Sequence, residues 1–261
     1  MSKRQANYSC GQTTIADSRR DGDQHNDAVV EMKDVVVGYG DNAVIRIERL
    51  ACKAGEVLVV VGRSGAGKTT LLNTLNGMIV PMSGVIQYRT DGTWVSKAPL
   101  TRIGRTFQSF PVLPWLKVRE QFEVRSRIVQ HQIDARCALT AMKAEHLAER
   151  FPWSLSGGER ARCAIALALS GETELLFLDE PFNGLDFSIR EGIVGEVRAA
   201  TKTRHIASVI VTHDLYDACQ VADEVAILGG RPTTLASVLR RGSGGQLNVD
   251  DILAELRACD R

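Results

Sequence analysis

The chain has 261 residues, 44% of them hydrophobic and 24% charged, a composition typical of a globular protein with length for one large α/β domain or two small ones. Its 32 basic and 31 acidic side chains leave a net charge of +1, so it lacks the broad positive field that bulk nucleic-acid binding needs. The longest apolar runs, at 57–61 and 164–169, are far shorter than the roughly 18 to 20 residues that span a bilayer. We therefore expect no nucleic-acid partner and no transmembrane segment.

Residues 1–28 contain few apolar side chains and no apolar run behind their basic residues, so we expect a flexible polar tail and no secretory signal. The six cysteines are widely scattered, with no C-x-x-C pair and no histidine at metal-ligand spacing. We therefore expect reduced thiols in a chain that stays in the cytoplasm. The cysteines are Cys10, Cys52, Cys137, Cys163, Cys219 and Cys259.

Strand and helix patterns alternate along the chain from residue 29. A hairpin is predicted first, from two β-branched runs that meet at Gly40 and Asp41. Three short apolar runs then have the pattern of strands buried on both faces of a parallel sheet, and each precedes a stretch of helical periodicity, which predicts a doubly wound α/β core. The strands are expected at 56–61, 175–178 and 208–211, and the helices at 69–78, 188–202 and 215–222.

Two further stretches interrupt or follow this core. Residues 118–148 contain no glycine or proline and mix short apolar clusters with charges, which predicts an inserted α-helical subdomain within about 110–157. The stretch 233–261 is glycine-rich at 242–245 and is expected to form a loop and a short terminal helix. The organised domain is therefore expected to cover 29–232.

A glycine-rich loop follows the first buried strand and opens a helix. Its sequence GRSGAGKTT fits G-x-x-x-x-G-K-S/T, in which backbone N–H groups surround phosphate oxygens, Lys68 reaches the β and γ phosphates and Thr69 can ligate Mg²⁺. A chance glycine turn is the alternative, but the position between strand and helix favours a nucleotide site. The loop residues are Gly62, Arg63, Ser64, Gly65, Ala66, Gly67, Lys68, Thr69 and Thr70.

Two acidic residues end a second apolar strand, LLFLDEP. Asp179 is expected to hold Mg²⁺, and Glu180 to orient the attacking water or take its proton. A solvated acidic pair at a strand end would be as plausible alone. Its combination with the phosphate loop indicates a nucleotide hydrolase.

The LSGGE sequence at 155–159 resembles the signature motif of ABC-type ATPases, and the family's other landmarks follow in order. Tyr39 matches the aromatic residue that stacks on adenine, Gln108 the glutamine that senses the γ-phosphate and metal, Asp186 the D-loop aspartate and His213 the switch histidine. Singly, the tyrosine could be a strand aromatic, the glutamine a surface residue and the histidine structural. Together they make a specific set, and the resemblance covers about 29–232.

The resemblance implies a P-loop NTPase (RecA-like) core with an N-terminal antiparallel β-subdomain and an inserted α-helical subdomain. It also implies ATP and Mg²⁺ as ligands and a homodimer, in which Ser156, Gly157 and Gly158 of one chain cover the γ-phosphate held by Lys68 of the other. Lys68, Gln108, Glu180 and His213 would be catalytic, and Thr69, Gln108 and Asp179 would serve the metal.

Within the family, the stretch 110–116 and the sequences around it look most like importer ATPases for nitrate, sulfonates, taurine and related small anions. That implies a cytoplasmic subunit bound to transmembrane permeases at the inner membrane, with an extracytoplasmic solute-binding protein as an indirect partner. Trp115 and Trp153 would line the permease groove or simply pack the helical subdomain. Glu159 and Leu167 depart from the family pattern and leave a degenerate regulatory module as one alternative. A soluble ATPase outside transport and an exporter subunit are the others.

Overall fold

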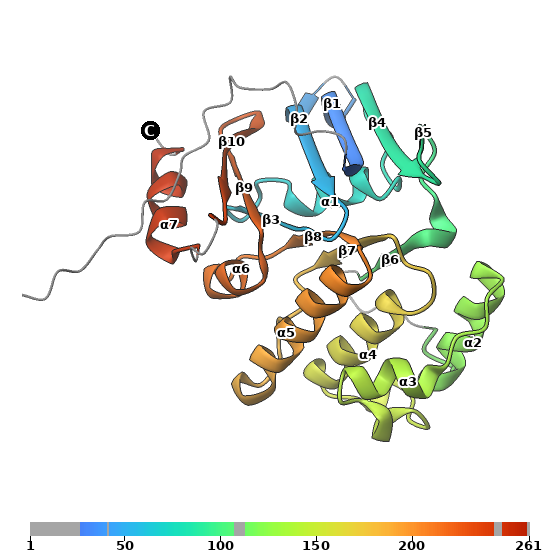
Figure 1. Cartoon of the computed structure of the whole chain (residues 1–261). Coiled ribbons are helices and arrows are strands. Elements are labelled where there is room, and N and C mark those ends of the chain that lie inside the picture. Colours follow the sequence, from blue (N-terminus) through green and yellow to red (C-terminus); the bar gives the residue numbers. More distant parts are fainter. Residues whose placement is uncertain (1–26, 41, 107–112, 243–246, 260–261) are drawn as a thin grey trace, which may run out of the picture.

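The computed structural model of the chain describes residues 27–40, 42–106, 113–242 and 247–259. These residues form one ten-stranded mixed sheet with helices on both faces (Figure 1). The strand order is β5-β4-β1-β2-β10-β9-β3-β8-β7-β6.

Five neighbouring strands at one end of the sheet are parallel. They are short and rich in Val, Ile and Leu, and the central ones are buried along nearly their whole length, as sheets covered on both faces require. The three predicted core strands are therefore confirmed. The parallel strands are β6 (Ile103–Arg105), β7 (Leu175–Asp179), β8 (Ala207–Val211), β3 (Val57–Gly62) and β9 (Glu224–Gly229).

Helices cover both faces of this parallel part, so its doubly wound architecture is confirmed. In β3, Val57, Val59 and Val61 pack into one hydrophobic cluster, whereas Leu58 and Val60 pack into another on the opposite face. Helix α1 (Lys68–Leu75) lies on the second face, and the first is covered by α4 (Gly157–Leu169), α5 (Phe187–Thr203), α6 (Leu215–Val221) and α7 (Val249–Ala258).

Antiparallel strands form the other end of the sheet, as predicted for the N-terminal β-subdomain. The expected hairpin pairs Val37 with Ile45 and Tyr39 with Asn42 at its tip. Two further antiparallel strands extend this part of the sheet, and α1 contacts β1. These strands are β1 (Ala28–Tyr39), β2 (Asn42–Lys53), β4 (Ser83–Thr90) and β5 (Thr93–Val95).

The expectation of a loop directly after residue 232 was wrong. Residues Thr233–Arg240 form strand β10, which runs antiparallel to β9 and pairs with β2 in parallel through Thr233 and Thr234. Its Thr and Ser residues obscured the alternating pattern, and its stability as a strand comes from pairing on both edges. The strand joins the antiparallel half of the sheet to the parallel half, so the sheet extends beyond the predicted boundary. The predicted terminal helix is present as α7.

The described part of the stretch predicted to form a helical subdomain, from residue 113 on, contains helices, and it projects from the parallel end of the sheet next to α4 (Figure 1). Helix α2 begins where the Lys117 N–H donates to Glu120 Oε2 at 2.7 Å, and α3 is capped by Asp134, whose carboxylate accepts from the N–H groups of Arg136 and Cys137. None of the helices among the described residues combines the length and apolarity that crossing a membrane requires. The elements of this subdomain are α2 (Val118–Val129), α3 (Ala135–Ala141), and the 3₁₀ turns Glu145–Leu147 and Pro152–Ser154. A further 3₁₀ turn, Leu100–Arg102, directly precedes β6.

Candidate functional site

The carboxyl ends of three adjacent parallel strands bring the predicted nucleotide residues together. Strand β8 lies between β3 and β7, and Val211 pairs with Val60 on one side and with Asp179 on the other. The phosphate loop leaves β3 at this edge, and His213 follows β8 there. Ligands of open α/β sheets bind outside the carboxyl ends of the strands, so this edge is the candidate nucleotide site.

The phosphate loop has the backbone that its glycines permit. Gly65 and Gly67 have φ angles of 79° and 77°, in the left-handed region where a side chain would be strained. Gly67 is the N-cap of α1, so the free N–H groups of that first turn and the helix dipole point to the same edge. The loop therefore provides an anion-binding concavity.

The Lys68 side chain folds back onto this loop and donates hydrogen bonds to its backbone. Its Nζ donates to the carbonyl oxygens of Gly62 at 2.8 Å and Arg63 at 3.0 Å. Burial lowers the pKa of the Lys68 ammonium, and the charges of Glu180 and Asp179 oppose that shift. The ammonium thus faces the two acidic residues across the site, where it can balance the charge of a bound phosphate.

Asp179 has the features of a metal ligand. Its carboxylate is buried and hydrogen-bonded to Thr69, and its Oδ1 atom has no hydrogen-bond partner among the described residues. An orphaned carboxylate oxygen beside a threonine hydroxyl fits Mg²⁺, which takes one or two protein ligands and completes its shell with water and phosphate oxygens. The described residues accordingly hold no cluster of three metal-ligating side chains. Burial raises the pKa of Asp179.

Glu180 turns sharply away from strand β7. Its φ of 47° places a non-glycine residue in the left-handed region, a strain common at functional sites. Its N–H donates to the carbonyl of Val211 at 2.9 Å, which fixes this turn against β8. The carboxylate, only 13% exposed, is thereby directed toward the residues that follow β8.

Three donors hold that carboxylate. The Thr212 hydroxyl and the His213 N–H donate to Oε2 at 3.3 and 3.4 Å, and His213 Nδ1 lies 2.8 Å from Oε1. Because an ionised carboxylate only accepts, the proton of this last contact resides on Nδ1. The Nε2 atom of the imidazole, whose side chain is 68% exposed, is then left to meet a ligand. Thr212 was missed at the sequence level, although its position between β8 and His213 was a usable signal.

The predicted adenine-stacking residue lies at the tip of the hairpin. Tyr39 is 67% exposed at the end of β1, where a base could stack on its ring. The hairpin lies against the phosphate loop, since a Cβ atom added to Gly67 would come within 2.8 Å of Ile45 Cδ1. Gln108, assigned to the γ-phosphate and metal, lies outside the described residues.

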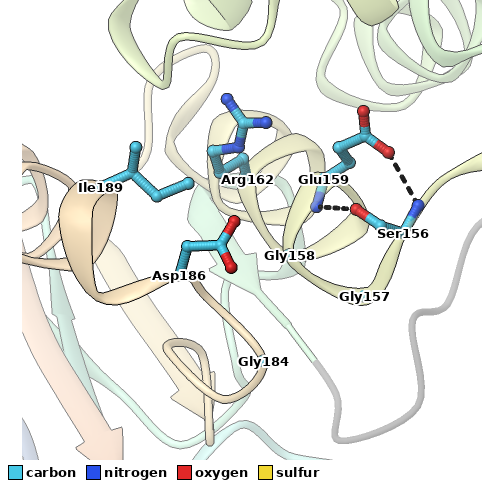
Figure 2. Close-up of a pocket in the computed structure, with 8 residues that line it drawn as sticks. All are labelled: Ser156, Gly157, Gly158, Glu159, Arg162, Gly184, Asp186 and Ile189. Carbon is cyan, nitrogen blue, oxygen red and sulfur yellow. Dashed lines mark hydrogen bonds between the residues drawn. The ribbon is translucent and has the colours of Figure 1, made fainter.

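The signature motif forms a separate hollow of about 410 Å³ at the start of α4. Figure 2 shows Ser156 at its rim, with Asp186 and Ile189 on the opposite wall facing Arg162. A Cβ atom on Gly158 would lie 2.8 Å from the Gly184 carbonyl, so the glycine permits close contact between the signature turn and the D-loop. Sequence reasoning missed three members of this hollow. They are Arg162, Gly184 and Ile189.

Ser156 and Glu159 form a capping box at this helix start. Glu159 N–H donates to Ser156 Oγ at 3.3 Å, and Ser156 N–H donates to Glu159 Oε2 at 2.8 Å (Figure 2). The backbone and hydroxyl of Ser156 lower the pKa of Glu159. The unusual glutamate therefore has a structural role at the helix terminus. The other unusual residue, Leu167, packs against the main hydrophobic cluster.

The hollow and the nucleotide edge are distinct places within one chain. The residues that line the hollow include Ser156, Gly157, Gly158 and Asp186, and none of the phosphate loop. The resemblance implies that these two sets meet on one nucleotide only when they come from two different chains. In a single chain, the described residues bring each set together but do not merge the two.

Two large aromatic side chains are exposed on the helical subdomain. Trp115 is 69% exposed and Trp153 is 72% exposed, with Trp153 stacked on Phe151 at a ring-centre distance of 5.9 Å. Neither tryptophan lies in the interior of the subdomain. The alternative that they simply pack the helical subdomain is therefore wrong for both. Exposed tryptophans are more common at interfaces than elsewhere on protein surfaces.

Comparison with known proteins identifies a family. Residues 47–183 match the family model described as "ABC transporter". A sulfate/thiosulfate import ATP-binding protein of Bradyrhizobium diazoefficiens is 33% identical in an alignment of 208 residues that covers 76% of this chain and 60% of the relative. A spermidine/putrescine import ATP-binding protein of Aggregatibacter actinomycetemcomitans is 31% identical over 210 residues, 78% of this chain and 56% of the relative. The chain thus spans about three fifths of these curated relatives.

Solved structures share the fold. The ATP-binding cassette MJ0796, in a dimeric post-hydrolysis state bound to ADP and Pi, superposes with a TM-score of 0.71 at 26% identity, covering 82% of this chain and 100% of that one. An ATP-binding subunit of an ABC transporter has a TM-score of 0.73 at 21% identity, with 88% and 99% covered. The named cargoes of the two curated relatives differ, and neither is nitrate, a sulfonate or taurine.

Proposed function

Because the chain belongs to the ABC transporter family, we propose that it is an ATP-hydrolysing subunit that works as a pair of identical chains. The observation that carries this proposal is the separation of the signature hollow from the phosphate loop within one chain. An open phosphate loop leaves the γ-phosphate facing solvent, whereas a helix start with free N–H groups binds anions. Two chains placed head to tail would supply both surfaces to each nucleotide.

In this arrangement the loop 62–70 binds the phosphates, with Lys68 toward the β and γ groups. Tyr39 stacks on the adenine, and Ser156 and Gly158 of the second chain cover the γ-phosphate. Thr69 and Asp179 would hold Mg²⁺, which supplies charge neutralisation of the phosphoryl group. Gln108 is assigned to the same metal and the attacking water.

Hydrolysis requires that Glu180 accept a hydrogen bond or proton from water. Its carboxylate is bonded to His213 and Thr212 in this structure, so the His213 contact has to open as the water is bound. Because Nδ1 carries the proton that Glu180 accepts, Nε2 of His213 donates to a γ-phosphate oxygen only when the imidazole is protonated on both nitrogens. The two residues would thus act as one unit.

Replacing Glu180 with Gln is the test of this proposal. The amide oxygen can still accept from the Thr212 hydroxyl and the His213 N–H, but the amide is a far weaker base than the carboxylate. We therefore expect turnover to fall at least about 100-fold while ATP remains bound. The trapped nucleotide should hold two chains together, which light scattering at saturating ATP measures. A variant that stays monomeric with ATP, or that hydrolyses ATP like the unaltered chain, would contradict the proposal.

We further propose an importer subunit at the cytoplasmic face of the membrane, docked on permeases by the helical subdomain with the exposed Trp115 and Trp153. The import names of the curated relatives support this role.

For the cargo we propose a small anion such as nitrate, a sulfonate or taurine, supported by the resemblance of 110–116 and by the anionic cargo in the name of one relative. Purification of the chain from its host membrane should recover a permease together with a binding protein that retains such an anion. Recovery of a cation-binding partner would refute the cargo, and recovery without any membrane protein would refute the importer.

A further inference from the structure

Arg190 lies between two parts of the candidate site, the signature hollow at Asp186 and the residues that follow His213. It lies one turn into α5, where its N–H donates to the carbonyl of Asp186, the D-loop residue at the wall of the signature hollow. Its guanidinium crosses to α6, where Nη2 donates to Asp214 Oδ2 at 2.7 Å and also to Asp217 Oδ2. Asp214 directly follows His213 as the N-cap of α6, and Asp217 lies in the first turn of that helix.

The contact with Asp214 continues to the catalytic carboxylate. Asp214 Oδ1 caps α6 by accepting from the N–H groups of Tyr216 and Asp217 at 2.9 and 3.2 Å, so Arg190 binds the oxygen that the cap does not use. The N–H of Asp214 donates to Thr212 Oγ1 at 3.1 Å, and that hydroxyl donates to Glu180 Oε2. A continuous set of hydrogen bonds therefore runs from Arg190 to Glu180.

Charge explains why an arginine is needed at this position. The Asp217 side chain is only 2% exposed, and burial raises its pKa, as do the charges of Asp214 and Glu180. The Arg190 guanidinium opposes that shift and lowers the pKa of Asp214 as well. Without it, the carboxylates of Asp214 and Asp217 would share a partly buried corner with no cation between them, and the start of α6 would be repelled from its place.

We propose that Arg190 is a positioning residue for the Glu180–His213 pair, acting through Asp214 and Asp217, and that it links this pair to the D-loop side of the same chain. The inference rests on the proposed function of Glu180 and His213. It adds that the α5–α6 contact, rather than strand β8 alone, sets where the His213 imidazole lies. If Asp186 moves when a second chain binds, Arg190 moves with it, because its N–H donates to the Asp186 carbonyl one helical turn away. The Arg190 guanidinium then displaces Asp214 and with it the neighbouring His213.

The chain contains a matched control on the same helix. Arg198, two turns further along α5, is 27% exposed compared with 25% for Arg190, and it also bonds to the α6 region. Its guanidinium contacts the carbonyls of Val221 and Ala222 and the carboxylate of Asp223, at the far end of α6 from His213. Loss of Arg198 weakens the packing of the same two helices but leaves His213 alone.

We therefore expect Arg190→Met to lower kcat at least about tenfold while KM for ATP stays within about twofold, and Arg198→Met to leave kcat within about twofold. Arg190→Lys, which keeps a cation for both carboxylates, should recover part of the loss. Asp214→Asn retains the capping oxygen and removes the ion pair, so it should lower kcat in the same way even if Arg190→Met folds poorly. Equal losses in the Arg190 and Arg198 variants, or none in Arg190→Met and Asp214→Asn, would overturn the inference.

A second readout separates this inference from the proposed function. The ¹⁵N NMR signal of His213 Nδ1 reports its hydrogen bond to Glu180 without any turnover. We expect it to shift in Arg190→Met and to stay in place in Arg198→Met. An unshifted signal in Arg190→Met refutes the positioning role, whereas a shifted signal in a protein that does not hydrolyse ATP refutes only the function proposed for the pair.

Discussion

Asp179 shows how a single residue can trade stability for function. Its carboxylate is buried at the end of β7, with one oxygen lacking a partner among the described residues, and burial raises its pKa. A carboxyl group whose pKa is higher in the folded chain than in the unfolded one favours folding only while it is protonated. That stabilisation is complete below the unfolded pKa and is lost as the pH rises through the folded pKa. At neutral pH the ionised carboxylate therefore costs stability until a cation binds.

Replacing Asp179 with Asn removes this cost together with the metal ligand. We expect the nucleotide-free variant to have a higher Tm than the unaltered chain at pH 7, with a difference that shrinks as the pH falls through the raised folded pKa and is gone below the unfolded pKa of about 3.9. Mg²⁺-dependent hydrolysis should fall at least about 100-fold. Thermal unfolding across this pH range checks the first part. Asp186→Asn, at an exposed position, is the control and should leave Tm unchanged. A difference that grows toward low pH would contradict the argument.

Among the elements, the start of α4 has two roles, a proposed contact with nucleotide and the capping of its own helix. Its N–H groups are proposed to face the nucleotide of a second chain, and its capping box fixes the turn that presents them. Glu159 accepts the N–H of Ser156 there, and Arg150 lies 3.9 Å from its other oxygen. The negative charge of Glu159 therefore interacts with the Ser156 N–H and with Arg150 of the same chain.

Glu159→Gln preserves an oxygen that can accept the Ser156 N–H, whereas Glu159→Ala does not. We expect the glutamine variant to retain the stability and the turnover of the unaltered chain. The alanine variant should lose about 0.5–1.5 kcal/mol of unfolding free energy, the usual net value of one hydrogen bond. Urea unfolding of the two variants measures this difference. If both lose the same amount, the charge rather than the capping geometry stabilises the turn.

At the scale of the whole molecule, the sandwich makes each nucleotide site a composite of two chains. Lys68→Ala damages the loop half of a site, and Ser156→Arg damages the covering half. In a mixed dimer one site receives both defects and the other receives neither, because the twofold arrangement pairs each loop with the partner's signature turn.

Each variant alone should be nearly inactive, and an equimolar mixture should recover about a quarter of the normal rate. Half of the dimers formed at random are mixed, and one of their two sites is intact. Steady-state ATPase measurements on the mixture, with each variant alone as control, provide the test. No recovery on mixing would mean that both halves of a site belong to one chain.

Local sequence was sufficient for the parallel core and the phosphate loop. The apolar runs that became β3, β7 and β8 are buried on both faces, so their composition identifies them without reference to neighbours. The glycines of the phosphate loop are likewise informative by themselves, because a left-handed φ angle at these positions favours glycine whatever surrounds them. Strand β10 was missed because its Thr and Ser residues obscure the alternating pattern, and because one of its two partners, β2, lies far away in the sequence.

The sequence by itself determined the family motifs, their order and the residue types available for chemistry. The tertiary structure decided which of them meet: Glu180 with His213 and Thr212 across β7 and β8, and Arg190 with Asp214 between two helices. It also decided that the signature hollow lies apart from the phosphate loop. The physical reason is that strand order and helix packing set these distances through contacts between residues remote in the chain, and no local pattern records such contacts.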